Sequence, residues 1–138
     1  MSVIVTDTGF TPANDVLDFT AAEDLGTGAA EGLALDLPSD ADPSDIIPHL
    51  ARIAVIRVDF PSFADGRGFT IARRLRMAGF TGTLRASGHV LADQYTMARR
   101  SGFDQVEISS EMASRQPAEQ WIFRADWRAH DYQSRLRA

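Results

Sequence analysis

The segment Ile53 to Phe60, which reads Ile-Ala-Val-Ile-Arg-Val-Asp-Phe, constrains the fold of this chain more than any other segment. A nearly continuous run of apolar, mostly β-branched residues is typical of a buried β-strand, and the Pro that follows ends it. Strands with this pattern lie in parallel sheets whose two faces are both covered. The segment therefore predicts a central strand, covered on both faces, in an α/β protein.

Shorter runs on either side predict that strands and helices alternate. We expect further strands at residues 3–5, 33–37, 83–86 and 106–108. Asp42 and Pro43 are the residues with which a short helix begins, and longer helices are predicted at 69–78, 90–100 and from Pro117 to about 136. Alternation of this kind implies right-handed crossovers between parallel strands. We expect a small, mostly parallel open sheet of four or five strands flanked by helices. The alternative is a partial β/α barrel, since four or five strands are too few to close a complete one.

The spacing of apolar residues also predicts which helix faces are buried. In the helix at 69–78 the buried positions are Ala72, Leu75 and Ala78. In the last helix the predicted apolar stripe is Trp121, Ile122 and Ala125. Gly79 and Gly102 follow two of the helices, where a glycine commonly ends a helix.

The chain of 138 residues has the length of one domain, and we expect a single α/β domain over residues 1–138. Residues 12–31 are rich in Ala, Gly, Thr and acidic side chains and show little periodicity. This region is predicted to be a loosely structured acidic arm.

Composition excludes several kinds of chemistry. The chain has no cysteine, which rules out disulfides, thiolate catalysis and thiolate metal ligands. Its net charge is −5, so non-specific binding to nucleic acid is disfavoured. Neither a basic leader nor a run long enough to cross a membrane occurs, and we expect a cytoplasmic protein without a membrane segment.

Two polar loops follow predicted strands of the sheet. Parallel α/β proteins bind ligands beyond the carboxyl ends of their strands, where helix N-termini attract anions. The first loop carries Asp65-Gly66-Arg67-Gly68, and the second runs from the end of one strand into a helix. The predicted anion site consists of Asp65, Arg67, Arg85, His89, Asp93 and Gln94. The alternative is that these groups pair with one another and fix the loops.

No motif identifies a reaction. A dinucleotide fingerprint, a Walker loop and a nucleophile elbow are all missing from the sequence. The three histidines are far apart, so no metal site is predicted. No cofactor of the protein's own is evident, and no catalytic residue can be named.

The two loops and their surroundings resemble a bacterial family. The matching pattern includes Phe60 and Phe63 with Asp65-Gly66-Arg67-Gly68-Phe69-Thr70, then Gly79-Phe80, Leu84-Arg85-Ala86, Asp93-Gln94 and Gly102-Phe103-Asp104. It resembles domain-of-unknown-function family number 934, whose members are often labelled oxidoreductases involved in sulfite reduction.

The resemblance implies a role in sulfur metabolism. We expect an accessory protein of assimilatory sulfite or sulfate reduction, which binds sulfite reductase, another sulfate-assimilation enzyme or a small anion. The alternative is an enzyme or sensor that acts on a sulfur oxyanion or a phosphorylated nucleotide. The aromatic residues of the last helix are also compatible with a homodimer.

Overall fold

The structure is a computed structural model, and it describes residues 2–13, 18–25 and 31–125. Seven strands form one sheet in the order β2-β1-β7-β6-β5-β4-β3. The strands are β1 (Ser2–Thr6), β2 (Gly9–Pro12), β3 (Phe19–Ala21), β4 (Leu33–Leu37), β5 (Ile53–Phe60), β6 (Thr83–Gly88) and β7 (Gln105–Ser109). The five strands β3 to β7 run parallel to one another, whereas β1 runs antiparallel to both β2 and β7.

Helices connect the parallel strands. The α-helices are α1 (Arg67–Met77), α2 (Tyr95–Ser101), α3 (Ser110–Arg115) and α4 (Ala118–Phe123). Short 3₁₀ helices are η1 (Ala22–Asp24), η2 (Pro43–Asp45), η3 (Ile47–Arg52) and η4 (Ala92–Gln94). As predicted, Asp42 caps η2, and its carboxylate accepts a hydrogen bond from the Ser44 amide at 2.9 Å.

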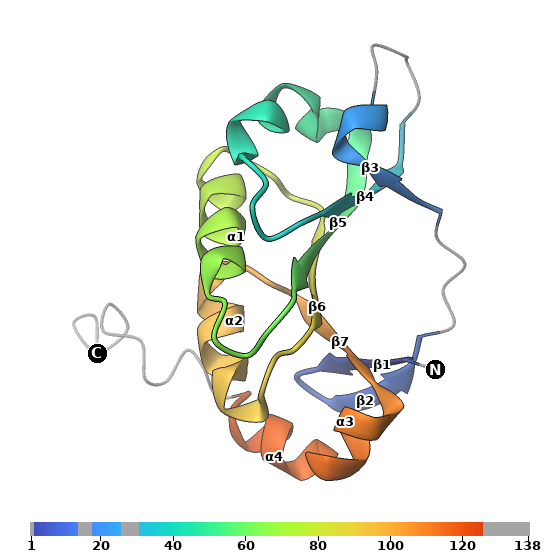
Figure 1. Ribbon diagram of the computed structural model, residues 1–138, viewed down its shortest axis with the longest axis vertical. Coiled ribbons are helices and arrows are strands. Elements are labelled where there is room, and N and C mark those ends of the chain that lie inside the picture. Colours follow the sequence, from blue (N-terminus) through green and yellow to red (C-terminus); the bar gives the residue numbers. More distant parts are fainter. Residues whose placement is uncertain (1, 14–17, 26–30, 126–138) are drawn as a thin grey trace, which may run out of the picture.

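The core lies between the sheet and the helices α1 and α2, which cover one face of it (Figure 1). Alternate residues of the strands point into this core, and the buried ones are Val5, Leu35, Leu37, Ile56, Val58, Phe60, Leu84, Ala86, Val106 and Ile108. Helix α1 packs with Ile71, Ala72 and Leu75, while Arg73 and Arg74 lie on its exposed side. This amphipathic pattern is what holds α1 on the sheet.

The predicted class, an α/β protein with a mostly parallel open sheet, is confirmed. The sheet is wider than the expected four or five strands, because β2 and β3 extend its two edges. The first predicted strand is β1, and it is antiparallel because a tight turn at Asp7 and Thr8 leads straight into β2. Within the acidic region 12–31, residues 19–21 form β3, the edge strand that pairs with β4.

We expected β5 to be covered on both faces, and the described residues place charged side chains on its second face. Ile56, Val58 and Phe60 point into the core, whereas Arg57 and Asp59 point to the opposite face. The structure describes no α-helix over that face of β4, β5 and β6 (Figure 1). Parallel sheets usually carry helices on both faces, so the second face of this sheet departs from the usual arrangement within the described residues.

Several helix boundaries differ from the predictions. Helix α1 begins at Arg67 and ends before Gly79, whose φ of +101° is the left-handed conformation expected of a glycine there. Ala78 is exposed, contrary to the prediction, because it lies past the last helical turn. The predicted helix at 90–100 divides into η4 and α2, and Gly102 ends it with φ +116°.

The region after β7 folds into two short helices. Ser109 caps α3, which the sequence did not predict, and α4 follows Pro117 as expected. Trp121 is fully buried against the ring of Tyr95. Ile122 was predicted on the buried stripe but is 44% exposed. The part of the predicted helix beyond residue 125 lies outside the described residues.

Candidate functional site

The two polar loops lie side by side at the carboxyl edge of the sheet, as the anion-site prediction requires. Phe60 and Gly88 are register partners at the ends of β5 and β6. The amide of His89 donates to the Phe60 carbonyl at 2.9 Å, and Nε2 of Gln94 donates to the Phe63 carbonyl at 3.1 Å. Gly88 allows this approach: its φ is +113°, and a Cβ there would lie 2.7 Å from the Phe60 oxygen.

Asp65 and Arg67 form an ion pair within the first loop. Asp65 accepts from Nε of Arg67 at 3.0 Å, from Nη2 at 2.7 Å and from the Arg67 amide at 3.1 Å. Nη2 of Arg67 also donates to the Ser39 hydroxyl at 2.8 Å. The hydrogen bonds from Arg67 hold the pKa of the Asp65 carboxyl well below its usual range. This pair fixes the loop that begins α1.

Arg85 lies away from that pair, on the opposite face of the sheet. Its side chain is only 5% exposed, and it donates to Gln105 Oε1 at 2.7 Å and to Glu107 Oε1 at 3.0 Å. Arg67 begins a helix on the covered face, so the two arginines of the predicted site do not converge.

The other predicted site residues also have internal contacts. Nδ1 of His89 faces the Phe60 carbonyl at 3.3 Å, and its ring packs edge-on against Phe63. Oε1 of Gln94 accepts from the Leu91 amide at 2.8 Å. Asp93 accepts from Arg124 at 3.0 Å. The structure thus brings His89 and Gln94 to the first loop, leaves Arg85 apart, and leaves anion binding by the six residues as a prediction.

A ladder of charged side chains crosses the face of the sheet opposite α1 and α2. Asp36, Arg57 and Arg85 are register partners on β4, β5 and β6. Nε and Nη2 of Arg57 donate to the two Asp36 oxygens, both at 2.7 Å. Glu107 on β7 lies between the arginines, at 3.4 Å from Arg57 and 3.0 Å from Arg85. The Asp36 hydrogen bonds raise the pKa of Arg57, which keeps this guanidinium charged.

An aromatic ring completes the ladder. Phe19 of β3 stacks on the Arg57 guanidinium, whose central carbon lies 3.7 Å from the ring centroid. Stacking of this kind stabilises a planar cation without satisfying its hydrogen-bond donors, which remain available to the carboxylates. The ladder is therefore a rigid, largely paired array of charges.

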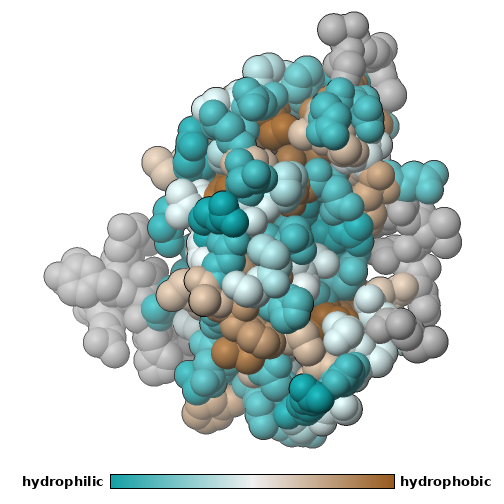
Figure 2. All heavy atoms as spheres, in the orientation of Figure 1, coloured by the Kyte–Doolittle hydropathy of each residue, from teal (hydrophilic) through white to brown (hydrophobic). Residues whose placement is uncertain are grey.

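A hollow of about 480 Å³ lies on this face at the carboxyl ends of the strands. We call it the sheet hollow, and the residues that line it are Ala21, Ala22, Glu23, Asp36, Leu37, Pro38, Arg57, Asp59, Ser87 and Glu107. Figure 2 shows mostly hydrophilic residues, with some hydrophobic ones among them, on the side of the molecule away from α1 and α2. Its volume lies within the range of ordinary ligand sites.

The ladder and the hollow were not predicted from the sequence. The signal was present in the alternation of Val55, Arg57 and Asp59 with buried apolar residues along β5. The residues around Asp36 and Glu107 do not indicate that either side chain contacts Arg57, because only the order of the strands brings them together.

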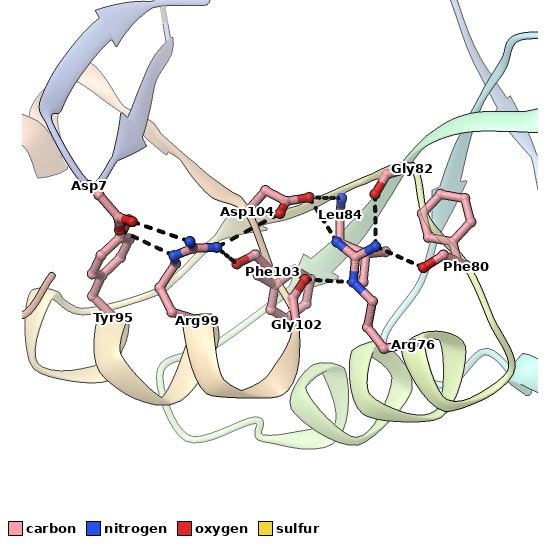
Figure 3. Close-up of polar contacts among 10 residues, drawn as sticks. All are labelled: Asp7, Arg76, Phe80, Gly82, Leu84, Tyr95, Arg99, Gly102, Phe103 and Asp104. Atoms are coloured by element: carbon pink, nitrogen blue, oxygen red, sulfur yellow. Dashed lines mark hydrogen bonds and ion pairs between the residues drawn. The ribbon is translucent and has the colours of Figure 1, made fainter. Parts of the chain in front are cut away.

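A second polar cluster lies at the opposite edge of the sheet (Figure 3). Arg76 of α1 donates to the carbonyls of Phe80, Gly82 and Gly102 at 2.8 to 3.0 Å and to Asp104 at 2.8 Å. Four acceptors from two loops thus surround one guanidinium. An open depression of about 570 Å³ adjoins it.

The same cluster holds the turn between β1 and β2. Arg99 of α2 donates to both oxygens of Asp7, at 3.1 and 3.2 Å, and to the Phe103 carbonyl at 2.7 Å. The hydroxyl of the buried Tyr95 donates to the same carboxylate at 2.5 Å (Figure 3). Because these donors and acceptors satisfy one another, the cluster fastens loops together and is the weaker candidate for a binding site.

Two further findings concern the described residues only. No group of three or more His, Asp or Glu side chains among them could hold a metal ion. No helix within the described part of the chain is long and apolar enough to cross a membrane.

The model of one protein family, described as bacterial protein of unknown function (DUF934), matches residues 34–138. The chain belongs to this family. The matched region contains β5 to β7, α1 to α4 and all of β4 except its first residue. It includes the four charged residues of the ladder and every residue of the predicted anion site, whereas Phe19 lies outside it. Comparison with functionally characterised proteins and with solved structures gave no match.

Proposed function

We propose that this chain is a non-catalytic accessory protein of assimilatory sulfite or sulfate reduction in the bacterial cytoplasm, which binds sulfite reductase or another enzyme of that pathway. The observation that carries the binding role is the internal pairing of both candidate anion-binding arginines, Arg67 with Asp65 and Arg85 with Glu107. A small anion would have to compete with these carboxylates for each guanidinium. The pathway itself comes from the label of the family that the sequence resembles.

The arrangement of the polar groups supports binding in preference to catalysis. A catalytic acid or base needs a partner that orients it and a position facing a substrate. His89 instead contacts a backbone carbonyl and the ring of Phe63, and the carboxylates of the ladder are held by arginines. A paired, rigid surface of this kind is suited to recognising another molecule.

Co-purification tests the proposal. The full chain and sulfite reductase of the same bacterium are produced together, with a tag on the reductase, and the eluate is analysed for this chain. We expect it to be retained at a fixed stoichiometry. Absence of retention when both proteins are abundant would remove the reductase as the partner.

Growth of a deletion strain tests the pathway independently. We expect the strain to grow poorly on sulfate and normally on sulfide as the only sulfur source. An equal defect on both sources would remove sulfite reduction from the proposal.

The second candidate is an enzyme or sensor for a small anionic ligand. The observation that favours it is the contact between the two polar loops beside the N-terminus of α1. Calorimetry with sulfite, sulfate and adenylylated sulfate discriminates between the candidates. Binding that Arg67→Ala abolishes would favour the second candidate over the accessory role.

A further inference from the structure

The face of the sheet opposite α1 and α2 is the feature that the proposed function leaves unexplained. In parallel sheets both faces are almost always covered, because their strands sit between layers. Here α1 and α2 cover one face, and the structure describes no α-helix over β4, β5 and β6 on the other. A second molecule seated on this face would complete the usual arrangement.

The sheet hollow is the place on this face where polar groups remain available. Asp59 of β5 and Ser87 of β6 are register partners at the end of their strands, and both line the hollow. Asp59 is exposed, and no hydrogen bond or ion pair involves its carboxylate within the described residues. A carboxylate and a hydroxyl side by side present acceptors to an incoming donor.

The charges around the hollow determine which occupant fits. Carboxylates outnumber the guanidinium groups: Glu23, Asp36, Asp59 and Glu107 lie around Arg57 and Arg85. The two arginines are already bound to Asp36 and Glu107, so Asp59 and Glu23 are the carboxylates of the hollow that no described residue pairs. An apolar occupant would remove these carboxylates from water without pairing them, which is costly.

A second copy of this chain fits poorly. In a two-fold dimer each surface meets itself, and Asp59 and Glu23 would face the same carboxylates of the other copy. The net charge of −5 adds repulsion between copies. An occupant that carries arginine or lysine side chains pairs with the free carboxylates instead.

We infer that the sheet hollow is a docking site for a basic segment of a partner protein, with an arginine or lysine side chain seated between Asp59, Ser87 and Glu107. The inference rests on the proposed accessory role and names the chemistry of the partner. The paired ladder supplies the rigid floor of the site, and Asp59 supplies the free charge.

Backbone amide NMR of the labelled full chain tests the site with a defined probe. The probe is a capped Gly-Arg-Arg-Gly peptide, and the reference is the same peptide with citrulline in place of both arginines. We expect the arginine peptide to shift the amides of residues 59, 87 and 107 and the citrulline peptide to leave them in place. Shifts scattered over other acidic surfaces, or none, would overturn the inference.

Two variants provide the matched comparison. Asp59→Asn keeps the shape of the side chain and removes its charge, and we expect at least fivefold weaker binding of the arginine peptide. Asp45→Asn removes an exposed carboxylate on η2, outside the hollow, and we expect no change. Equal weakening by both variants would show non-specific attraction. Binding of free arginine amide as tight as that of the peptide would indicate a small-molecule site, and it would overturn the docking assignment.

The same variants separate this inference from the proposed function. If the reductase retains wild-type protein and the Asp59→Asn variant equally, the docking site is wrong and the accessory role stands. If the peptide binds at the hollow but the reductase does not bind, the site stands and the partner is wrong. A shift of the chain to a dimer in gel filtration that Asp59→Asn abolishes would assign the hollow to a second copy and overturn the inference.

Discussion

Asp36 and Arg57 form a two-point ion pair between β4 and β5, with both nitrogen-to-oxygen distances at 2.7 Å. The pair lies in the middle of a parallel sheet, where apolar side chains are usual. Glu107 and the Phe19 ring contact the same guanidinium from other strands. Arg57 of β5 therefore contacts residues of β4, β7 and the edge strand β3 through one side chain.

Replacing Arg57 tests how much this link contributes to stability. Arg57→Met keeps the aliphatic part of the side chain but removes the guanidinium, which leaves Asp36 and Glu107 without their common partner. We expect a loss of about 1–3 kcal/mol in the free energy of unfolding, measured by urea denaturation. Arg73→Met is the control, because Arg73 is exposed on α1, and we expect a change within about 0.5 kcal/mol.

A double variant distinguishes an ion pair from simple packing. If Asp36→Asn and Arg57→Met remove the same interaction, their combined effect is smaller than the sum of the two single effects. Strict additivity would show that the ion pair contributes nothing beyond the individual side chains.

The glycine at the end of β6 provides a second test. Gly88 and Gly79 both have positive φ, at +113° and +101°, so alanine is strained at each position. Only at Gly88 would the new Cβ also meet backbone, 2.7 Å from the Phe60 oxygen. We expect Gly79→Ala to lower the free energy of unfolding by about 1 kcal/mol. Gly88→Ala should lower it by about 1–3 kcal/mol more than Gly79→Ala, because of the added steric contact. Urea denaturation measures both losses. Equal costs would mean that the two loops separate easily at this point.

The fold was predictable where the signal was local. The glycines that end α1 and α2, the Asp42 cap of η2 and the strands β4 to β7 follow from a few neighbouring residues each. The width of the sheet was not predictable in this way. Strands β2 and β3 are four and three residues long, and they form because β1 and β4 offer them an edge.

The candidate site was predicted only in part, for the same reason. The meeting of the β5–α1 and β6–η4 loops follows from the rule that neighbouring parallel strands end at one edge. Which face each side chain occupies depends on register, and Arg85 points to the face opposite Arg67. The partners of Arg57 come from positions 36 and 107, which only the completed strand order brings together.

Arg76 tests whether the cluster in Figure 3 is structural. Its guanidinium reaches three carbonyls and Asp104, and no ammonium group can meet four acceptors in that planar arrangement. We expect Arg76→Lys to lower the free energy of unfolding by about 2 kcal/mol. The control is Arg74→Lys on the same helix, where the half-exposed side chain bonds Ser44 and lies 3.8 Å from Asp42, and we expect a change within about 0.5 kcal/mol. Similar effects of the two variants would contradict a structural role for the hydrogen bonds of Arg76.

Tyr95 makes the alkaline stability of this protein unusually simple to interpret. Burial, and secondly its hydrogen bond to Asp7, raise the pKa of the Tyr95 hydroxyl far above its ordinary value of 10.0. The chain has no lysine and no cysteine, so its two tyrosines are the only side chains with ordinary pKa values between about 8 and 12. The other tyrosine, Tyr132, lies outside the described residues and is unchanged in the variant below.

The direction of the pH effect follows from which state keeps the proton. Above pH 10 the unfolded chain loses the Tyr95 proton while the folded chain retains it. The contribution of Tyr95 to the free energy of unfolding is therefore complete below pH 10 and declines above it. Urea denaturation from pH 8 to 11.5 should show the free energy of unfolding falling by up to about 1.4 kcal/mol per pH unit above pH 10. Tyr95→Phe should be less stable at pH 8 by about 1 kcal/mol, because a hydrogen bond is lost, and should show a shallower decline at high pH. A decline of the same slope in the variant would mean that Tyr95 ionises in the folded protein and that its bond to Asp7 does not hold the proton.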